Sequence, residues 1–148
     1  PYRVIVSGRI KHFISAFGEH IIGKEVEQAM KEATENSAIR INEFTVAPQI
    51  NPDSGLPYHE WFVEFENEPE NLSDLAQKLD VSLQKQNSYY LDLIEGKVLQ
   101  PLKISKIEKN GFQQYMKSLG KLGGQNKIAR LSNDRKIADA LKPYTLLK

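Results

Sequence analysis

The sequence predicts an α+β fold, a single domain in which flanking helices cover a mixed or antiparallel sheet. Segments with the alternating pattern of strands and segments with the period of helices follow one another without a strict strand–helix–strand repeat. The 148 residues suffice for one core, and 40% hydrophobic with 26% charged residues is ordinary for a globular domain. No apolar run approaches the roughly 20 residues that span a bilayer.

The first third of the chain predicts two strands and a helix. Strand-like runs cover Tyr2–Ser7 and Ile10–Phe17, and Gly18 breaks the second run. A helix is expected within Gly23–Asn36, where lysines and glutamates occupy the face opposite an apolar stripe. The stripe consists of Val26, Ala29, Met30 and Ala33.

Two further strands follow around a turn. Ile39–Val46 predicts a strand with a bulge near Asn42–Glu43, because the apolar positions change parity there. Asn51–Pro57 is rich in turn-forming residues. In Trp61–Phe65 apolar residues alternate with glutamates, which predicts one buried face and one face toward water.

The following segment predicts a helix, a break and another strand. Asn71 can cap a helix that ends near Asn87, and a short segment, Ser88–Gly96, comes next. A strand is expected around Leu102 and Ile104. The apolar face of the helix is formed by Leu72, Leu75, Leu79 and Leu83.

The C-terminal segment predicts two helices on either side of a glycine-rich loop. Asn110 is the expected cap of the first helix. Ser132 is the expected cap of the second, which runs to Leu141 and is ended by Pro143. The apolar positions of the first helix are Phe112, Tyr115, Met116 and Leu119.

Charge is distributed unevenly, although the net charge is only +1. Residues 101–148 carry eleven basic and three acidic side chains, whereas residues 51–100 carry three basic and ten acidic ones. The basic third would suit an anionic partner such as nucleic acid, nucleotide or phosphate. The alternative is that it neutralises the acidic middle third within the fold.

The absence of cysteine excludes disulfides, thiolate zinc sites and a cysteine nucleophile, and it fits a reducing, cytoplasmic location. The N-terminus is not a secretion signal, since no basic start precedes a long apolar core. It begins without methionine on a strand-like run, which suggests a piece of a longer chain.

The stretch Gly120–Leu131, GKLGGQNKIARL, has the most distinctive composition, with three glycines and two lysines in its first eight residues. It does not follow the phosphate-loop rule, because Gln125 stands where the second glycine is required. Two alternatives remain open from spacing alone. The stretch is a plain turn between helices, or it is the mount of one functional lysine, Lys127.

The stretch Gly8–Glu27 predicts a strand–turn–strand unit with basic ends, suited to a phosphate. The alternative is a hairpin with solvated charges. Spacing among the three histidines of the chain matches no zinc site, so no metal site is expected. The residues of the stretch that carry or can acquire positive charge are Arg9, Lys11, His12 and His20.

The remaining candidates for chemistry are weaker. Alternating glutamates are possible acid–base groups, although such residues usually face water. Aromatic residues in strands and helices are candidates for stacking a ring, although they more often belong to the core. The glutamates are Glu60, Glu64 and Glu66, and the aromatic residues are Trp61, Tyr89 and Tyr90.

Two of these stretches resemble motifs of adenylate-forming enzymes. The stretch GRIKHFISAFGEHIIGKEVE resembles the segment that opens their C-terminal domain, and GGQNKIARL resembles their final motif, in which a glycine-rich turn presents one lysine. Lys127 matches that lysine. The positions that match the opening segment are Gly8, Arg9, Lys11, Gly18, Glu25 and Glu27.

The intervening sequence resembles the acyl-acid amido synthetases of the auxin-responsive Gretchen-Hagen family, in their bacterial branch. The resemblance covers nearly the whole chain and includes the stretches 43–66, 87–104 and 115–127. Ala129 stands where the family has proline, which should alter loop stiffness more than chemistry. The large N-terminal domain of the family is absent from this chain.

The resemblance implies that residues 1–148 form the mobile C-terminal lid domain of an ATP-dependent ligase. Such an enzyme adenylates a carboxylic acid and then joins it to an amine, such as that of an amino acid. ATP and Mg²⁺ would be bound mainly by the missing N-terminal domain, which would be the main partner together with the acyl-adenylate. The isolated domain is expected to be inactive, and no membrane partner is expected.

The resemblance also implies roles for individual residues. Lys127 would be catalytic, and Lys11 would be the hinge about which the domain turns. The expected nucleotide-binding residues are Arg9, Gly18, His20 and Gly124.

An alternative from another class is a stand-alone nucleic-acid- or protein-binding module that uses the basic C-terminal third. Nucleic acid is the less expected partner, because that third lacks an RNA-binding signature and interleaved aromatic residues. A structural domain that has lost adenylation is a further alternative, which the presence of Lys127 and Arg9 disfavours.

Overall fold

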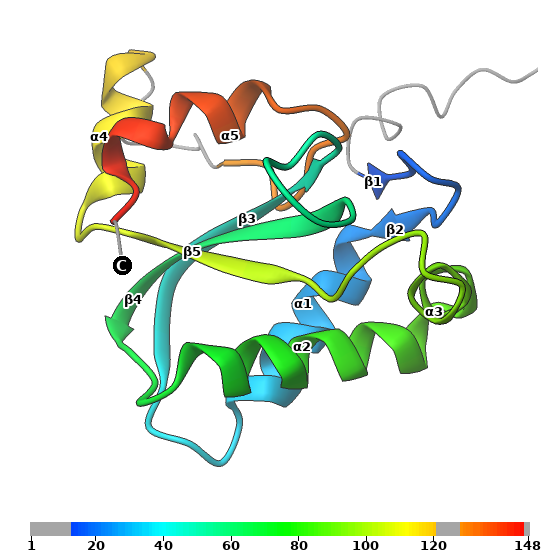
Figure 1. Cartoon of the computed structure of the whole chain (residues 1–148). Helices are drawn as coiled ribbons and strands as arrows, with labels where there is room; N and C mark the ends of the chain where they lie inside the picture. Colours follow the sequence, from blue (N-terminus) through cyan, green and yellow to red (C-terminus); the bar gives the residue numbers. More distant parts are fainter. Residues whose placement is uncertain (1–12, 121–127, 147–148) are drawn as a thin grey trace, which may run out of the picture.

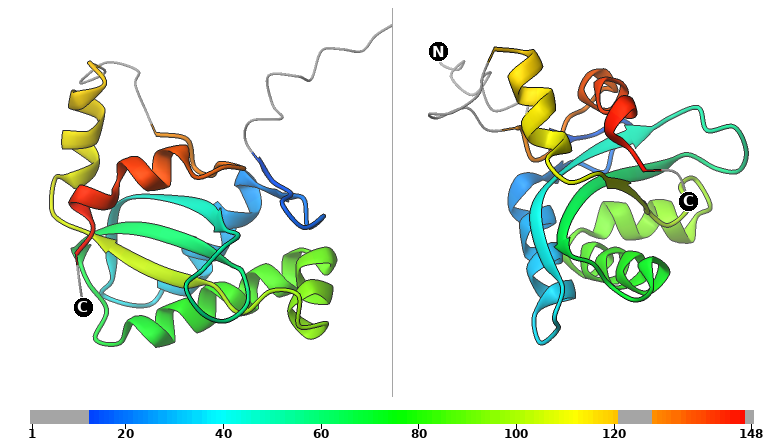
Figure 2. Two further views of the ribbon diagram at one scale, coloured as in Figure 1. Left: turned by 45° about the horizontal axis from the view of Figure 1, so that its top comes forward. Right: turned by 90° about the vertical axis from the view of Figure 1, so that its left-hand side faces the viewer.

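A three-stranded mixed sheet lies between two pairs of helices in the computed structural model, which describes residues 13–120 and 128–146 (Figure 1). The strands are β3 (Arg40–Gln49), β4 (Tyr58–Asn67) and β5 (Lys103–Ile107). One face is covered by α1 (Gly23–Thr34) and α2 (Leu72–Gln86), and the other by α4 (Gly111–Ser118) and α5 (Lys136–Ala140) (Figure 2). This arrangement confirms the predicted α+β class.

Smaller elements complete the fold. A two-stranded antiparallel hairpin, β1 (Phe13–Ile14) with β2 (Ile21–Ile22), precedes α1. The short segment after α2 is the helix α3 (Ser88–Glu95), and the chain closes on a 3-10 turn, η2 (Lys142–Tyr144). The predicted strand Tyr2–Ser7 lies outside the described residues. No helix in the described part of the chain is long and apolar enough to cross a membrane.

The central strand β4 pairs antiparallel with β3 and parallel with β5, so the sheet is mixed, as predicted. The predicted bulge is also confirmed. Ile41 pairs with Phe65 and Glu43 with Glu64, which leaves Asn42 without an opposite residue. The extra residue restores the alternation, so that the apolar side chains on both sides of the bulge point into the core.

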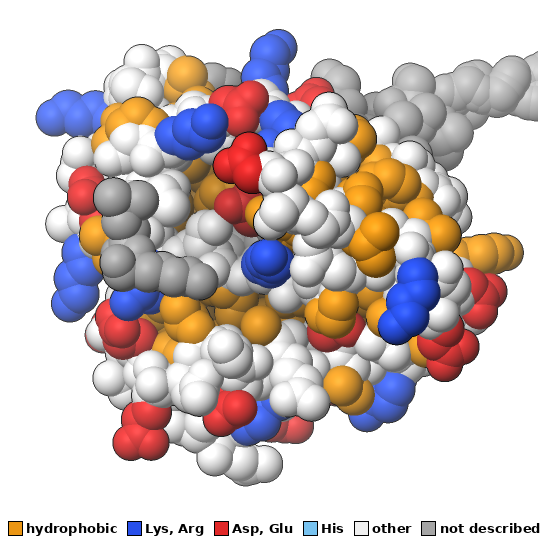
Figure 3. Space-filling model, viewed as in Figure 1, with side chains coloured by type: hydrophobic (Ala, Val, Ile, Leu, Met, Phe, Trp, Pro, Cys, Tyr) orange, Lys and Arg blue, Asp and Glu red, His pale blue; other side chains and the backbone are white. Residues whose placement is uncertain are grey.

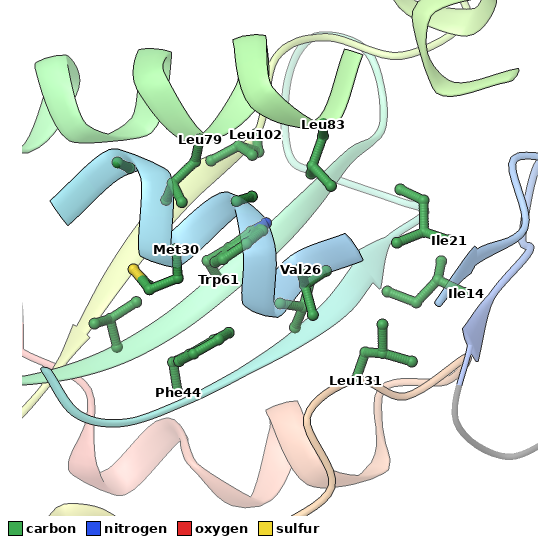
Figure 4. Close-up of a cluster of buried hydrophobic side chains, with 14 of the residues drawn as sticks. Ile14, Ile21, Val26, Met30, Phe44, Trp61, Leu79, Leu83, Leu102 and Leu131 are labelled. Carbon is green, nitrogen blue, oxygen red and sulfur yellow. The ribbon is translucent and has the colours of Figure 1, made fainter. Parts of the chain in front are cut away.

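The main core fills the space between the sheet and the helices α1 and α2. Phe44 of β3 and Trp61 of β4 stack at its centre, with ring centroids 5.5 Å apart and planes 6° from parallel (Figure 4). The predicted caps hold α2 in place over them: the side chain of Asn71 accepts hydrogen bonds from the amides of Ser73 and Asp74. The predicted helical stripes supply the cover, with Val26, Ala29, Met30, Ala33, Leu75, Leu79 and Leu83 all buried.

A second core lies on the opposite face of the sheet, where the sequence predicts water. Phe62 of β4 packs there with residues of α4 and α5 such as Phe112 and Leu141. The prediction of one solvated face on β4 is therefore wrong. The reason is that both C-terminal helices fold back over this face, which buries Glu64 to 5% exposure and leaves Glu60 14% exposed.

Glu64 rather than Asn110 caps α4. The amides of Asn110 and Phe112 donate to its carboxylate over 3.0 and 3.3 Å, and Asn42 donates to it from the bulge. Asn110 has φ +67° and its side chain makes no capping bond, so the predicted cap is wrong. A buried carboxylate needs donors, and the free amides at a helix N-terminus supply them.

The predicted cap of the last helix is also wrong. The helix α5 begins at Lys136, whose amide donates to the Asp134 carboxylate over 3.0 Å. Ser132 instead donates its amide to the Val46 carbonyl over 2.9 Å, which places it beside β3. The helix is thus shorter than predicted, because the preceding residues are used as an extension of the sheet.

Replacing Glu64 by alanine should lower the free energy of unfolding by about 1–3 kcal/mol, because it leaves the buried amide of Phe112 and the partly buried amide of Asn110 without this acceptor. Glu66, exposed on the same strand, provides the matched control: Glu66→Ala should change stability by less than about 0.5 kcal/mol. Urea unfolding followed by circular dichroism measures both. Equal effects of the two substitutions would contradict the capping role.

Candidate functional site

Two described segments carry or adjoin the predicted site residues: the turn Ser15–His20 between β1 and β2, and the segment Ile128–Asn133 that follows the glycine-rich stretch. Gly18 and His20 lie on the turn and are exposed. Arg9, Lys11, Gly124 and Lys127 lie outside the described residues, as does His12, so their predicted roles stay predictions.

The turn reverses the chain through left-handed backbone conformations. The Gly18 amide donates to the Ser15 carbonyl over 3.3 Å, and φ is +92° at Gly18 and +48° at His20. A Cβ added at Gly18 would meet no atom within 4 Å. Glycine is therefore required there for its backbone conformation rather than for space, and the turn presents an open stretch of backbone.

Glu19, between these two exposed residues, points into the protein and is fully buried. Its carboxylate accepts the Phe17 amide over 2.8 Å, and its Oε2 lies 2.6 Å from Nε2 of the equally buried His59 on β4. Burial by itself raises the pKa of the Glu19 carboxyl, but the hydrogen bond and charge of His59, with backbone donors, outweigh burial. The pKa of Glu19 therefore ends below its ordinary value.

Asn87, at the junction of α2 and α3, holds the main chain of the same turn. Its side-chain amide donates to the Glu19 carbonyl over 2.9 Å and to the Glu25 carboxylate over 3.2 Å. Its side-chain oxygen accepts the Tyr90 amide over 2.9 Å and so caps α3. The predicted helix break at Asn87 is confirmed, and the same residue ties that break to the turn.

The segment after the glycine-rich stretch runs parallel to β3. Val46 donates its amide to the Arg130 carbonyl over 3.0 Å and forms an isolated parallel bridge with Leu131. The Thr45 hydroxyl donates to the Ala129 carbonyl over 2.7 Å. Ala129 stands where the resembling family has proline, and it contacts Thr45 through its carbonyl, which proline would retain.

Arg130 anchors this segment by its side chain. Its guanidinium donates to Glu27 over 3.0 Å, and to Glu43 and the Phe44 carbonyl over 2.5 Å each. It also lies 4.1 Å from the centre of the Phe44 ring. Burial lowers the pKa of Arg130, but hydrogen bonds to Glu43 and Glu27 and their charges raise it above its ordinary value. The guanidinium is therefore a permanent cation that joins α1 and β3 to the end of the stretch.

The two segments lie next to each other. The Ser15 amide of the turn donates to the Asn133 side chain over 2.9 Å. Ile14, Ile21 and Leu131 lie side by side at one end of the main core and are all fully buried (Figure 4). The fold thus brings together two motifs that stand more than a hundred residues apart in the sequence.

The basic third of the chain is partly neutralised within the fold. Positive and negative side chains are interspersed on the face shown in Figure 3. The pairs of Arg135 with Glu60 and of Lys106 with Glu68 support the predicted neutralisation of the acidic middle third, whereas the partners of Arg130 lie in the first third of the chain. The ion pairs are Arg130 with Glu27 and Glu43, Arg135 with Glu60 and Asp139, and Lys106 with Glu68.

The weaker candidates have structural positions. Glu60 accepts bonds from Arg135 and from the Ser105 hydroxyl, over 2.8 and 2.6 Å. Trp61 and Tyr90 are fully buried, whereas Tyr89 is 63% exposed. Among the described residues no group of three or more His, Asp or Glu could hold a metal ion.

Sequence reasoning did not single out Glu19, His59 or Arg130 as parts of this site. Glu19 and His59 are 40 residues apart, and Arg130 and Glu27 are 103 apart. No local pattern announces such pairs. The available signal was weak: a glutamate between two turn residues, with a single histidine on a strand otherwise rich in apolar and acidic residues.

Comparison with known proteins identifies relatives of the fold. The model of the GH3 family C-terminal domain matches residues 24–136. A solved GH3.15 acyl acid amido synthetase superposes with TM-score 0.72 at 16% identity, over 93% of this chain and 27% of that chain. AtGH3.15 acyl acid amido synthetase in complex with 2,4-DB superposes with TM-score 0.70 at 15% identity, over 93% and 26%.

At this level of identity the two structures show a shared fold only. The chain spans about a quarter of their length. A search of curated proteins found no match. These matches do not distinguish between branches of the family.

The lowered pKa of Glu19 predicts a stability difference that depends on pH. Ionised Glu19 stabilises the fold above its unfolded pKa of about 4.5, and this contribution is lost as the pH falls through the lower folded value. Glu19→Gln should therefore be several kcal/mol less stable than the parent at pH 7, on the order of 3–5 for a broken buried pair, with the gap narrowing below pH 4.5.

Denaturant unfolding of both proteins between pH 7 and pH 3 measures this gap. Exposed Glu35 supplies the control, since Glu35→Gln should cost little at any pH. A gap between parent and Glu19→Gln that stays constant down to pH 3 would show that the pairing with His59 does not depend on the ionised carboxylate.

Proposed function

The chain belongs to the GH3 C-terminal domain family, and on this premise we propose that it is the mobile C-terminal domain of an ATP-dependent acyl-acid amido synthetase. The observation that carries the proposal is the family match over residues 24–136. The fold adds that the exposed turn Ser15–His20 and the segment Ile128–Asn133 lie side by side. The isolated domain is expected to be inactive, because it spans about a quarter of the solved relatives.

The proposed reaction has two half-reactions. First, the carboxylate of the acid attacks the α-phosphorus of ATP, and pyrophosphate leaves as the acyl-adenylate forms. Second, the amine attacks the acyl carbonyl, the C–O bond to phosphate breaks, and AMP leaves with the electron pair while the amine loses a proton. The first step brings two anions together, so it needs positive charge at the point of approach.

We assign that charge to Lys127. An ammonium is a compact cation that can contact both the carboxylate and the phosphate oxygens. The geometry of the neighbouring residues supports this role, because Arg130 and the bonds to Val46 fix the chain just beyond Lys127 to β3. Gly124 would let the backbone approach the nucleotide closely.

The turn Ser15–His20 is the second contributor. Its exposed residues Gly18 and His20 would meet the adenylate in the second half-reaction, after the domain has turned about Lys11 and Lys127 has withdrawn. Only a few backbone angles need to change at such a hinge. Arg9 would contact the ribose or phosphate.

The described residues suit nucleotide contacts better than metal binding. The turn offers backbone groups and one histidine, and no described cluster of acidic residues could hold a cation. We therefore assign Mg²⁺ and most of the ATP contacts to the larger N-terminal domain. When bound, Mg²⁺ would neutralise charge on the leaving pyrophosphate.

Lys127→Ala in the full-length protein should lower acid-dependent ATP–pyrophosphate exchange on the order of 10²–10³-fold, as for the loss of an oxyanion donor. Lys121, in the same stretch, is the matched control, and Lys121→Ala should keep most of the exchange. Undiminished exchange in Lys127→Ala would remove the proposed role of Lys127.

Lys11→Pro should restrict the hinge, because proline fixes φ near −65° and removes a backbone donor. One half-reaction should survive and the other should fail. Exchange measures the first, and single-turnover amide formation from isolated acyl-adenylate measures the second. Lys11→Ala retains the backbone freedom and should support both. If Lys11→Pro also ran both normally, the hinge would lie elsewhere.

A further inference from the structure

We propose that Glu19, His59 and Asn87 are positioning residues. They hold the Gly18–His20 turn in a fixed position relative to the three-stranded sheet for the amide-forming step. The inference rests on the proposed function and assigns a role within it to residues that contact no substrate. It starts from one observation. The turn is secured by buried polar contacts to two other elements, rather than by apolar packing alone.

The side chain of Glu19 sets the depth of the turn. Its carboxylate is fully buried and receives the Phe17 amide from within the turn and His59 from β4. Gly18 and His20 on either side are exposed. Because the carboxylate must reach His59, its position determines how far the backbone of its two neighbours stands out from the surface.

His59 is itself fixed to the sheet. It lies in β4 opposite Pro48 of β3, and it is 1% exposed. Its ring packs against the ring of Tyr90, with centroids 5.3 Å apart, and the Tyr90 hydroxyl donates to the Asp80 carboxylate of α2. The hydrogen bond between His59 and Glu19 thus fixes the turn relative to β4, which packs against α2 and α3.

Asn87 holds the turn from a second direction. Its side-chain amide donates to the carbonyls of Glu19 and His20, over 2.9 and 3.4 Å. His59 of β4 therefore holds the turn through the side chain of Glu19, and Asn87 at the α2–α3 junction holds it through the main chain. Two contacts from different elements restrain both translation and tilt, which a single contact would not.

This arrangement predicts a selective defect. In the proposed reaction the turn meets the adenylate in the second half-reaction, whereas Lys127 acts in the first. A displacement of a positioning contact by about 1 Å can cost on the order of 10²-fold in rate. Loosening the turn should therefore slow amide formation and leave adenylation largely intact. A residue needed only for stability would affect both steps together.

The test uses the full-length enzyme and three variants. His59→Leu removes the donor at nearly constant volume, and His59→Gln restores a side-chain N–H near the position of Nε2. Asn87→Ser keeps an oxygen to cap α3 but is too short to reach the Glu19 carbonyl. ATP–pyrophosphate exchange and single-turnover amide formation report the two half-reactions separately.

We expect His59→Leu and Asn87→Ser to lower the amide-forming rate at least about tenfold, on the order of 10²-fold at most, with exchange changed less than about threefold. His59→Gln should recover most of the loss. Arg135→Met is the matched control, because it breaks the Arg135–Glu60 pair on the other face of the sheet. It should leave the ratio of the two rates unchanged.

Equal losses in both half-reactions, or normal amide formation in His59→Leu and Asn87→Ser, would overturn the positioning role. If His59→Leu does not fold, Asn87→Ser decides by the same ratio. The two half-reactions of the parent enzyme distinguish failure of the positioning role from failure of the proposed function. If the parent supported neither acid-dependent exchange nor amide formation, the proposed function would be wrong, and the positioning role would fall with it.

Discussion

A buried carboxylate must find donors, and this requirement organises the protein around the central strand β4. Three polar residues of this strand, His59, Glu60 and Glu64, each pair with a segment distant in sequence. His59 holds the β1–β2 turn, Glu60 holds α5 through Arg135, and Glu64 caps α4. An unpaired charge at any of these positions would be costly, so the pairing specifies where the distant segments lie.

The contacts differ in what they can contribute to stability. Lys106 and Glu68 form a pair at the surface, with Glu68 59% exposed, and such pairs contribute about 0–1 kcal/mol. The Glu19–His59 pair and the Glu64 cap are removed from water, where breaking one partner costs several times more. The turn of the proposed site is thus attached by the stronger class of contact, whereas Arg130 anchors residues 128–133 through the partly exposed Glu27 and Glu43.

The proposed function needs parts that are both exposed and held. Gly18 and His20 are exposed on a turn whose middle residue, Glu19, is buried. Residues 128–133, at the end of the glycine-rich stretch, are fixed by the side chain of Arg130. In the proposed function, binding energy from a nucleotide would then not be consumed in ordering the turn and residues 128–133. The two segments share one end of the core, so a movement of the domain would carry them together.

Local patterns in the sequence determined the elements with strong periodicity or local capping chemistry. The stripes of α1 and α2, the Asn71 cap, the break at Asn87 and the bulge at Asn42 all follow from residues close in sequence, because spacing alone decides which side chains share a face. The family motifs likewise directed attention to Gly18 and His20, which the fold places on an exposed turn.

Only the tertiary structure decided which polar residues are buried and which groups they bond to. Asn110 and Ser132 have the composition of caps, yet Glu64 caps α4 and Ser132 joins β3, because a helix end uses whichever partner the fold brings to it. The alternating glutamates of β4 have the pattern of a solvent-exposed face, yet α4 and α5 cover that face of the sheet. Pairs such as Glu19 with His59 join residues that are neighbours only once the chain has folded, and no local propensity encodes them.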